Sequence, residues 1–385
     1  MNGPRFNQKL LQVPLYIAGR SVDEVKEELG LSHITKLASN ENPLGPSPAA
    51  VQAASAMLQQ AHRYPGVLER DLRRKLARRC SQKPAAMRGA TGRSPLVRLE
   101  ADGVVIGNGG TDVLRLITQA FVFDGGNTVM SRVSFPMYRI LTTMFGGEPR
   151  IVEAGPEGTH DLDAMLEMID DDTRVVFLCS PNNPTGQVIM DDDARAFVER
   201  VPERVVVVFD ESYFDYKVDA AAVRSIGFIG EGRNVISVRS FSKTGGLANL
   251  RLGYMYAPAR LANYVEHAKV PFHVGDVALA AAMASLDDDS YLEEQIRAVE
   301  AGRTYLVEAI RALGLDCMES QANFVLFFTG DGQGAGIVEE LLRSGFIVRE
   351  MTPFGLPDAI RVTVGRPVEN SGFVTALEQV MAQVS

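Results

Sequence analysis

The segment RVVVVFDESY, residues 204–213, decides the fold class that we expect for this chain. Its run of valines is typical of a strand that is buried on both faces, as in a parallel sheet covered by helices. The strand ends in two carboxylates, Asp210 and Glu211. Asp210 is predicted to be nearly buried, and a buried carboxylate needs a partner. A helix N-terminus, an arginine or the protonated ring nitrogen of a bound ligand would each supply one.

Two other apolar runs, RVVFLCS at 174–180 and NVISVRS at 234–240, are also predicted to be buried strands. Helical patterns alternate with these strands. One of them is TDVLRLITQAF at 111–121, whose apolar residues share one helical face. This alternation predicts an α/β fold with a mostly parallel sheet covered by helices.

The length of 385 residues is enough for two domains. Toward the C-terminus, a long helical stretch is followed by short strands and helices, which is typical of a smaller α+β domain. We predict a large domain over 40–270 and a small domain over 1–39 and 271–385. The segment 79–102 is basic and rich in turn residues, so we expect an exposed excursion there.

Composition limits the classes of partner. A net charge of −9 argues against nucleic acid, since phosphate backbones select a basic face. The apolar runs are too short for a membrane span, and the first residues lack the apolar core of a signal peptide. The three cysteines fit reduced thiols, and the five histidines form no metal-ligand pair. We therefore expect a cytoplasmic protein with no metal and no membrane or nucleic-acid partner.

Further polar segments are expected at the same edge as Asp210, because ligands of open α/β sheets bind outside the carboxyl ends of the strands. GNGGTD at 107–112 opens a helix at a glycine turn, which favours a phosphate, although a plain strand-to-helix turn fits the pattern equally well. SPNNPTG at 180–186 presents two amides that suit a ring oxygen, although its prolines make a turn in any case.

The segment SVRSFSKTGGLANLRLGY at 237–254 places Lys243 among hydroxyls and one arginine. Ser240, Ser242 and Arg251 suit an anion. Positive charge and partial burial would lower the pKa of the lysine and favour the free amine that forms Schiff bases. A phosphate seat, a carboxylate for a ring nitrogen and an amine for an aldehyde together predict pyridoxal 5′-phosphate as the cofactor.

These motifs resemble those of the fold-type I pyridoxal-phosphate enzymes of the class I/II aminotransferases, and most closely the histidinol-phosphate aminotransferases. The resemblance covers nearly the whole chain and includes NENPLGPSP at 40–48, RYPG at 63–66 and QANFVLF at 321–327. It implies a large domain with a mostly parallel sheet and a smaller α+β domain. The chain departs from the family pattern after the lysine, where TGG replaces the more usual Ala-Phe-Gly with smaller, more flexible residues.

The resemblance also implies a role for each site residue. Lys243 would bond to the cofactor and carry the proton, Asp210 would pair with the ring nitrogen, and Tyr213 would complete the catalytic set by holding the ring's phenolic oxygen. The other implied cofactor-binding residues are Gly110, Thr111, Phe135, Asn183, Ser240, Ser242 and Arg251, with Tyr64 reaching across from the neighbouring subunit of a homodimer.

The implied substrates are small amino acids and 2-oxo acids. Arg361 matches the arginine that binds the α-carboxylate. The implied reaction converts L-histidinol phosphate and 2-oxoglutarate to imidazole acetol phosphate and L-glutamate, in histidine biosynthesis. An aromatic amino acid aminotransferase, a lyase similar to threonine-phosphate decarboxylase and a non-catalytic ligand sensor are the alternatives. The positions that match those around the distal group of the substrate are Tyr16, Asn40, Asn323 and Arg349.

Overall fold

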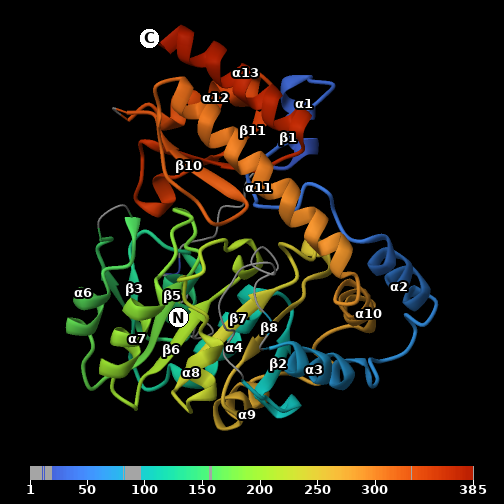
Figure 1. The fold of residues 1–385 in the computed structure, drawn as a ribbon, viewed down its shortest axis with the longest axis vertical. Helices are drawn as coiled ribbons and strands as arrows, with labels where there is room; N and C mark the ends of the chain where they lie inside the picture. The colour runs from blue at the N-terminus through green and yellow to red at the C-terminus, as the bar shows by residue number, and fades with distance from the viewer. Residues whose placement is uncertain are drawn as a thin grey trace, which may run out of the picture.

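The computed structural model describes residues 11, 13, 20–80, 82, 97–155, 158–330 and 332–384. Two sheets lie toward opposite ends of the long axis of the molecule (Figure 1). The predicted substrate residue Tyr16 and most of the segment 79–102 lie outside the described residues.

A seven-stranded sheet forms the centre of the larger part, and it confirms the predicted α/β class with a mostly parallel sheet. Strand β8 runs antiparallel to both of its neighbours, and the sheet from β7 to β4 is parallel throughout. The three strands predicted from the sequence are β5, β6 and β7. In spatial order the strands are β2 (Val104–Gly107), β8 (Gly253–Tyr256), β7 (Val235–Ser240), β6 (Val206–Asp210), β5 (Thr173–Cys179), β3 (Asn127–Ser131) and β4 (Glu148–Val152).

Helices cover both faces of this sheet. Alternate valines of β6 pack into different clusters, Val206 and Val208 into one and Val207 into the other, as the two-residue period of a strand requires. The first cluster includes α4 (Gly110–Phe121), α5 (Met137–Met144) and α9 (Ala259–His267); the second includes α6 (Leu162–Glu167), α7 (Asp191–Arg200), α8 (Ile226–Gly230), α2 (Pro48–Leu58), α3 (Leu68–Arg79) and α10 (Asp276–Ser285).

The smaller part is built on a four-stranded antiparallel sheet. Phe324, Phe327 and Phe373 are fully buried in its core. The N-terminal segment joins it through β1 (Thr35–Lys36), which pairs in parallel with β11 (Phe346–Ile347). The sheet order is β12 (Arg349–Glu350), β13 (Ala359–Thr363), β10 (Phe324–Phe328) and β9 (Asp316–Cys317), and the remaining helices are α1 (Val22–Leu29), α11 (Asp289–Ala312), α12 (Gly334–Arg343) and α13 (Pro367–Val384).

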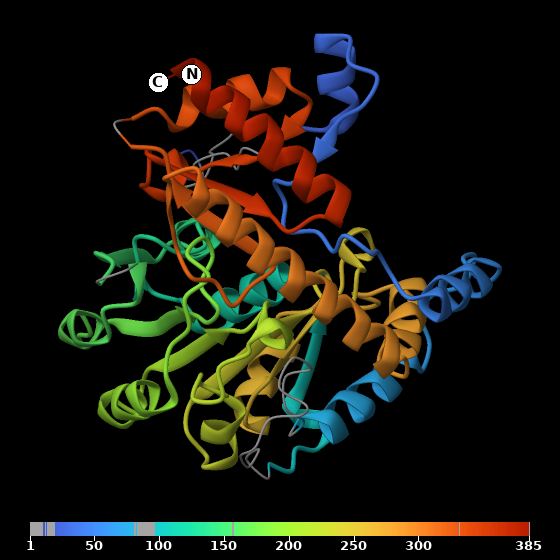
Figure 2. The same ribbon diagram turned by 45° about the horizontal axis from the view of Figure 1, so that its top comes forward.

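The helical stretch predicted after residue 275 is two helices, α10 and α11. Asp288 starts α11 by accepting a hydrogen bond from the Tyr291 amide at 3.2 Å. Figure 2 shows α11 running from the four-stranded sheet to α10, and α10 belongs to the core of the larger part. The domain bounds derived from the sequence stay a prediction. None of the described helices is both long and apolar enough to cross a membrane.

An ion network lies buried where β6 ends. The Glu211 carboxylate accepts from Arg239 Nη2 at 2.9 Å and from Lys217 Nζ at 3.3 Å. The Arg239 guanidinium stacks 3.4 Å from the Phe214 ring centroid. Burial alone would raise the pKa of Glu211, but the two positive charges outweigh it and lower that pKa. The sequence suggests an arginine as one candidate partner for the buried carboxylate of Asp210, and the structure places an arginine, Arg239, on the neighbouring Glu211.

We predict that Glu211→Gln will destabilise the fold by about 3–5 kcal/mol, because it leaves two buried cations without a counter-charge. Glu231→Gln, which removes an exposed partner of Arg195, should cost less than about 1 kcal/mol. Urea unfolding measures both. The folded-state pKa of Glu211 is lowered, so its stabilisation is present above the ordinary glutamate pKa of about 4.3 and is lost as pH falls. Equal costs for the two variants would contradict the network.

Candidate active site

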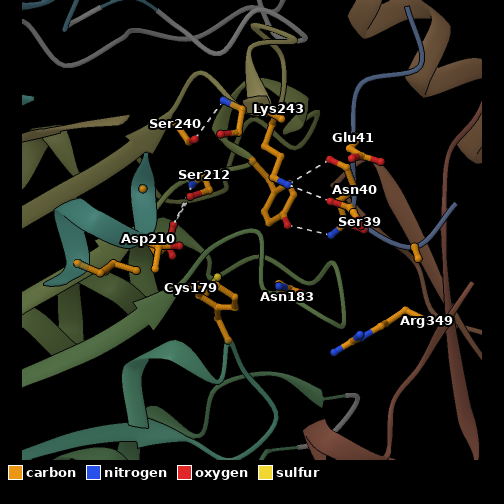
Figure 3. A pocket seen from close by; sticks show the side chains of 18 of the residues that line it. Ser39, Asn40, Glu41, Cys179, Asn183, Asp210, Ser212, Ser240, Lys243 and Arg349 are labelled. Carbon is orange, nitrogen blue, oxygen red and sulfur yellow. Dashed lines mark hydrogen bonds between the residues drawn. The ribbon is translucent and has the colours of Figure 1, made fainter. Parts of the chain in front are cut away.

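A cavity of about 440 Å³ lies at the carboxyl ends of β5, β6 and β7, between the two sheets. Figure 3 shows residues of both parts facing it. It also takes in Ser39, Glu41, Cys179, Ser212 and Phe354, which the sequence analysis did not single out. The residues expected from the sequence that line it are Asn40, Gly110, Thr111, Phe135, Asn183, Asp210, Tyr213, Ser240, Ser242, Lys243, Arg251, Arg349 and Arg361.

Asp210 lies in the wall of this cavity with only 4% of its surface exposed. Its Oδ1 accepts from the Ser212 amide at 3.1 Å and the Ser212 hydroxyl at 2.6 Å. Its Oδ2 accepts from the Tyr138 hydroxyl at 2.9 Å. Burial raises the pKa of Asp210, and these hydrogen bonds oppose that rise. The donors of these hydrogen bonds are neutral groups, so the negative charge of Asp210 is available to a cation in the cavity.

Tyr138, like Ser212, is a contact of Asp210 that the sequence analysis missed. Its ring is fully enclosed and stacks on Phe177, with centroids 4.8 Å apart and planes at 6°. It meets Phe135 edge to face at 5.8 Å. The only signal in the sequence is its position three residues after Phe135, at the start of a helix. A role for this tyrosine depends on the packing of α5 against β5 and β6.

Lys243 follows β7 and extends into the cavity toward Ser39 and Asn40, as Figure 3 shows. It is half-buried, and its Nζ donates to the backbone carbonyls of Ser39 at 3.3 Å and Asn40 at 3.1 Å. Burial, and next the positive charge of Arg361, lower the pKa of Lys243 to about 8. More of this amine is therefore uncharged near neutral pH than in an ordinary lysine, whose pKa is about 10.4.

Asn40 holds several of these groups together. Its backbone is in the left-handed region, with φ of 54°, which is uncommon for a residue other than glycine. Its Nδ2 donates to the Tyr213 hydroxyl at 2.9 Å, and its Oδ1 accepts from Thr363 at 3.2 Å. Asn323, which is not in the cavity lining, donates to the Asn40 carbonyl at 3.0 Å. Both asparagines thus support the carbonyls that receive Lys243, and their expected contact with substrate stays a prediction.

The expected phosphate seat forms where α4 begins. Gly109 has φ of 91°, and a Cβ there would lie 2.4 Å from Arg251 Nη2. A Cβ on Gly253 would lie 2.5 Å from the Gly109 carbonyl carbon, so two glycines let these backbones approach. Arg251 Nη1 donates to the Ala248 carbonyl at 2.8 Å and not to a carboxylate. Among the described residues, no side chain caps the first turn of α4. The Asp112 amide donates to the Gly109 carbonyl at 3.1 Å, so the N–H groups of Gly110 and Thr111 are the ones that can face an anion.

The two glycines after Lys243 have a steric role. Gly246 has φ of 65°, and a Cβ there would lie 2.3 Å from the Gly45 carbonyl oxygen. A Cβ on Gly245 would lie 2.7 Å from the Phe241 carbonyl oxygen. Asn42 donates to the Lys243 carbonyl at 3.1 Å. Gly246, which the family pattern shares, therefore allows the segment 39–46 to pack against the lysine loop, whereas Gly245, which departs from that pattern, lies close to Phe241 within the loop.

Arg361 extends from β13 into the cavity, where it donates to the Ala38 carbonyl at 2.8 Å and to the Asn183 side-chain oxygen. Arg349, on β12, also lines the cavity and is labelled in Figure 3. Tyr64 is not brought to this cavity within one chain. It is 78% exposed and stacks on Phe272 at 4.6 Å, so its expected role across a subunit boundary stays a prediction.

Residues 32–377 match the family described as aminotransferase class I and II. The chain belongs to this aminotransferase family. The match spans both sheets and every described residue that lines the cavity. Amino-group transfer is therefore the activity of this chain.

Among curated relatives of this aminotransferase, histidinol-phosphate aminotransferase 2 of Pseudomonas aeruginosa is 40% identical over 95% of this chain and 95% of its own length. Histidinol-phosphate aminotransferase of Bacillus subtilis is 35% identical over 98% of this chain and 100% of its own. The crystal structure of histidinol-phosphate aminotransferase from Sinorhizobium meliloti in complex with pyridoxal 5′-phosphate superimposes with a TM-score of 0.87 at 24% identity, with both chains fully covered. That structural likeness concerns the fold.

Tyr138→Phe tests the hydrogen bond to Asp210 without disturbing the ring stack. Loss of a donor to the charged carboxylate should raise the pKa of Asp210 further. We expect kcat for transamination to fall about tenfold and the acidic limb of its pH profile to move to higher pH, together with a loss of about 1–2 kcal/mol of stability.

Tyr256→Phe is the matched control, since the buried Tyr256 hydroxyl donates to the Leu76 carbonyl at 3.0 Å, remote from the cavity. It should lose comparable stability and keep the pH profile. Steady-state kinetics between pH 5 and 9 separates the two variants. An unchanged acidic limb in Tyr138→Phe would show that the tyrosine only packs.

Proposed function

We propose that this protein transfers the amino group of L-histidinol phosphate to 2-oxoglutarate, using pyridoxal 5′-phosphate, as a cytoplasmic step of histidine biosynthesis. The observation that carries the proposal is the placement of Lys243 and Asp210 in one cavity, beside an uncapped helix start and Arg251. The names and nearly full-length coverage of the curated relatives support this substrate.

The residues present fit the cofactor. The cradle at Gly109 and Gly253 leaves no room for a Cβ, and Arg251 directs a guanidinium there that is bonded to neutral oxygens. Asp210 offers a buried negative charge for the ring nitrogen, and Phe135 an aromatic face in the same cavity. The residues proposed to hold the cofactor are Gly110, Thr111, Phe135, Asn183, Asp210, Tyr213, Ser240, Ser242, Lys243 and Arg251, with Tyr64 from the second copy of a homodimer.

When bound, pyridoxal phosphate supplies an aldehyde for the amino group and a ring that stabilises negative charge at the substrate's α-carbon. Asp210 holds the proton on the ring nitrogen. Lys243 Nζ takes the α-proton of the substrate and returns it on the cofactor side, which its lowered pKa allows. The carbonyls of Ser39 and Asn40 orient this amine between transfers.

Two arginines are assigned to the two ends of the substrate. Arg361 is buried beside Asn183 and is assigned the α-carboxylate, because a guanidinium binds carboxylates through two parallel hydrogen bonds. Arg349 is assigned the distal anion, either the phosphate of histidinol phosphate or the second carboxylate of 2-oxoglutarate. A cation at this position favours an anionic distal group over the apolar ring of an aromatic amino acid, which is the second candidate substrate.

The pKa of Lys243 can be measured through cofactor capture. Only the free amine attacks an aldehyde, so capture of pyridoxal phosphate by the cofactor-free protein should accelerate with pH, with a midpoint of about 8. Arg361→Gln removes a neighbouring positive charge and should raise this midpoint. Visible absorbance follows the reaction. Lys243→Ala should develop no visible absorbance band when pyridoxal phosphate is added. If this variant kept both the band and turnover, the assignment of the lysine would be refuted.

The substrate is tested by comparing kcat/KM for histidinol phosphate and phenylalanine in the native protein and in Arg349→Gln. We expect histidinol phosphate to be preferred, and the variant to lose about 10- to 100-fold in kcat/KM for it, from one lost charge-assisted interaction. Phenylalanine turnover should change little. A native preference for phenylalanine would favour the aromatic alternative, and carbon dioxide release without a 2-oxo acid would favour a lyase.

A further inference from the structure

A second cavity, of about 220 Å³, adjoins the candidate active site. Phe135 and Phe354 contribute to the walls of both cavities, so the second one lies at the border of the first. Its other walls come from the end of β3, the start of α5, β4 and the segment from η7 (Thr352–Phe354) to Gly355. It is therefore a crevice between the two parts of the chain, next to the place where substrate binds.

Two arginines line this crevice in a protein of net charge −9. Arg139 is exposed on α5, and no carboxylate among the described residues lies within ion-pair distance of it. Arg132 pairs with Glu153 at 2.6 Å, but Glu153 is 72% exposed. An exposed pair of this kind contributes little and is readily exchanged for another anion. The crevice thus has positive charge that is largely uncompensated.

A buried hydroxyl also lies in the wall of this crevice. Ser131, at the end of β3, is only 5% exposed and lines the cavity, and its Oγ has no hydrogen-bond partner among the described residues. A buried hydroxyl without a partner is costly, and a ligand oxygen in the crevice would satisfy it. Ser134 in the same wall differs, because its hydroxyl already donates to Asn182 at 2.8 Å.

The start of α5 adds to the positive potential. Pro136 is its N-cap and offers no side-chain hydrogen bond, so the positive end of the helix dipole is not capped there. On the opposite wall, a Cβ on Gly355 would lie 3.7 Å from Arg132 Cδ, which shows that this segment packs along the arginine stem. A bound anion would contact both parts of the chain at once.

We propose that this crevice is a second anion subsite, which takes one carboxylate or phosphate group through Arg139, Arg132 and Ser131. This proposal rests on the proposed function, because the substrates of that reaction are dianions. They are 2-oxo dicarboxylates and phosphorylated amines that pass its mouth on the way to Arg349 and Arg361. Local positive charge beside a cleft raises the concentration of such ions and their rate of entry. Free inorganic phosphate has the same recognition chemistry.

The first experiment titrates the cofactor-loaded Arg349→Gln protein with inorganic phosphate, because that background weakens anion binding in the main cavity. Isothermal calorimetry should detect binding of millimolar strength. Adding Arg139→Gln should weaken it about tenfold, as for the loss of one charge-assisted contact, and adding Ser131→Ala severalfold. Arg297→Gln on α11 is the control, since it removes another exposed positive charge away from the crevice. Equal phosphate affinity with Arg139→Gln and Arg297→Gln would overturn the proposal.

The second experiment identifies the source of the anion. If the subsite serves the substrate, Arg139→Gln alone should lower kcat/KM for 2-oxoglutarate about fivefold, and salt should remove the difference. If it serves free phosphate, kcat/KM should stay the same while inhibition by phosphate weakens. Both results support the subsite; no change in either quantity overturns it. Phosphate binding needs no turnover, so a failure of the proposed reaction would be seen separately, in the comparison of amino donors.

Discussion

Two successive carboxylates at the buried end of β6 set the conditions for the whole site. Side chains of adjacent strand residues point to opposite sides, so Asp210 and Glu211 meet different surroundings. Glu211 meets Lys217 and Arg239 and is neutralised within the protein. Asp210 accepts hydrogen bonds from the amide and hydroxyl of Ser212 and the hydroxyl of Tyr138, with the positive charge of Lys243 nearby. The charge of Glu211 therefore stabilises the fold, and the charge of Asp210 faces the cavity.

The consequence for Asp210 is energetic. Burial raises its pKa more than the hydrogen bonds and the charge of Lys243 lower it, so the site gains stability when a protonated group arrives opposite the carboxylate. Water has little access to the Asp210 carboxylate, because only 4% of this residue is exposed. A cationic ring nitrogen in the cavity would therefore stabilise the charged carboxylate better than water does. The packing around β6 thus favours a ligand with a protonated ring nitrogen. The hydroxyl of Tyr138 adjusts the pKa of Asp210 and with it the strength of this preference.

The segment 39–46 couples this site to the four-stranded sheet. Its carbonyls at Ser39 and Asn40 receive Lys243, while the Asn40 side chain bonds Thr363 of β13. Gly246 permits the close approach, since no side chain fits between it and Gly45. Any rotation of the four-stranded sheet would therefore move the carbonyl acceptors of the lysine. The strain of a left-handed Asn40 is tolerated because three separate hydrogen bonds hold it.

Local patterns were enough to predict three strands of the larger sheet (β5, β6 and β7), the α/β class and the polar side chains that follow those strands. Lys243, Asp210 and Arg251 could be predicted because short motifs present them at the sheet edge. Tyr138 could not be, since its role depends on α5 packing against a strand 72 residues further along the chain. The contacts of Lys243 join residues 203 and 204 positions apart, and no periodicity predicts which backbone carbonyl will face an amine over that separation.

The cations of the cavity act on the lysine as well as on ligands. Arg361 and Arg251 both lower the pKa of Lys243, because each disfavours a second positive charge nearby. A carboxylate bound at Arg361 or a phosphate at Arg251 cancels that charge, and the pKa of the lysine then rises. The amine is thus least basic when the anion sites are free and gains proton affinity as they fill. The arginines that are proposed to bind the anions would therefore prepare the lysine first to react as a free amine and then, with anions in place, to hold a proton.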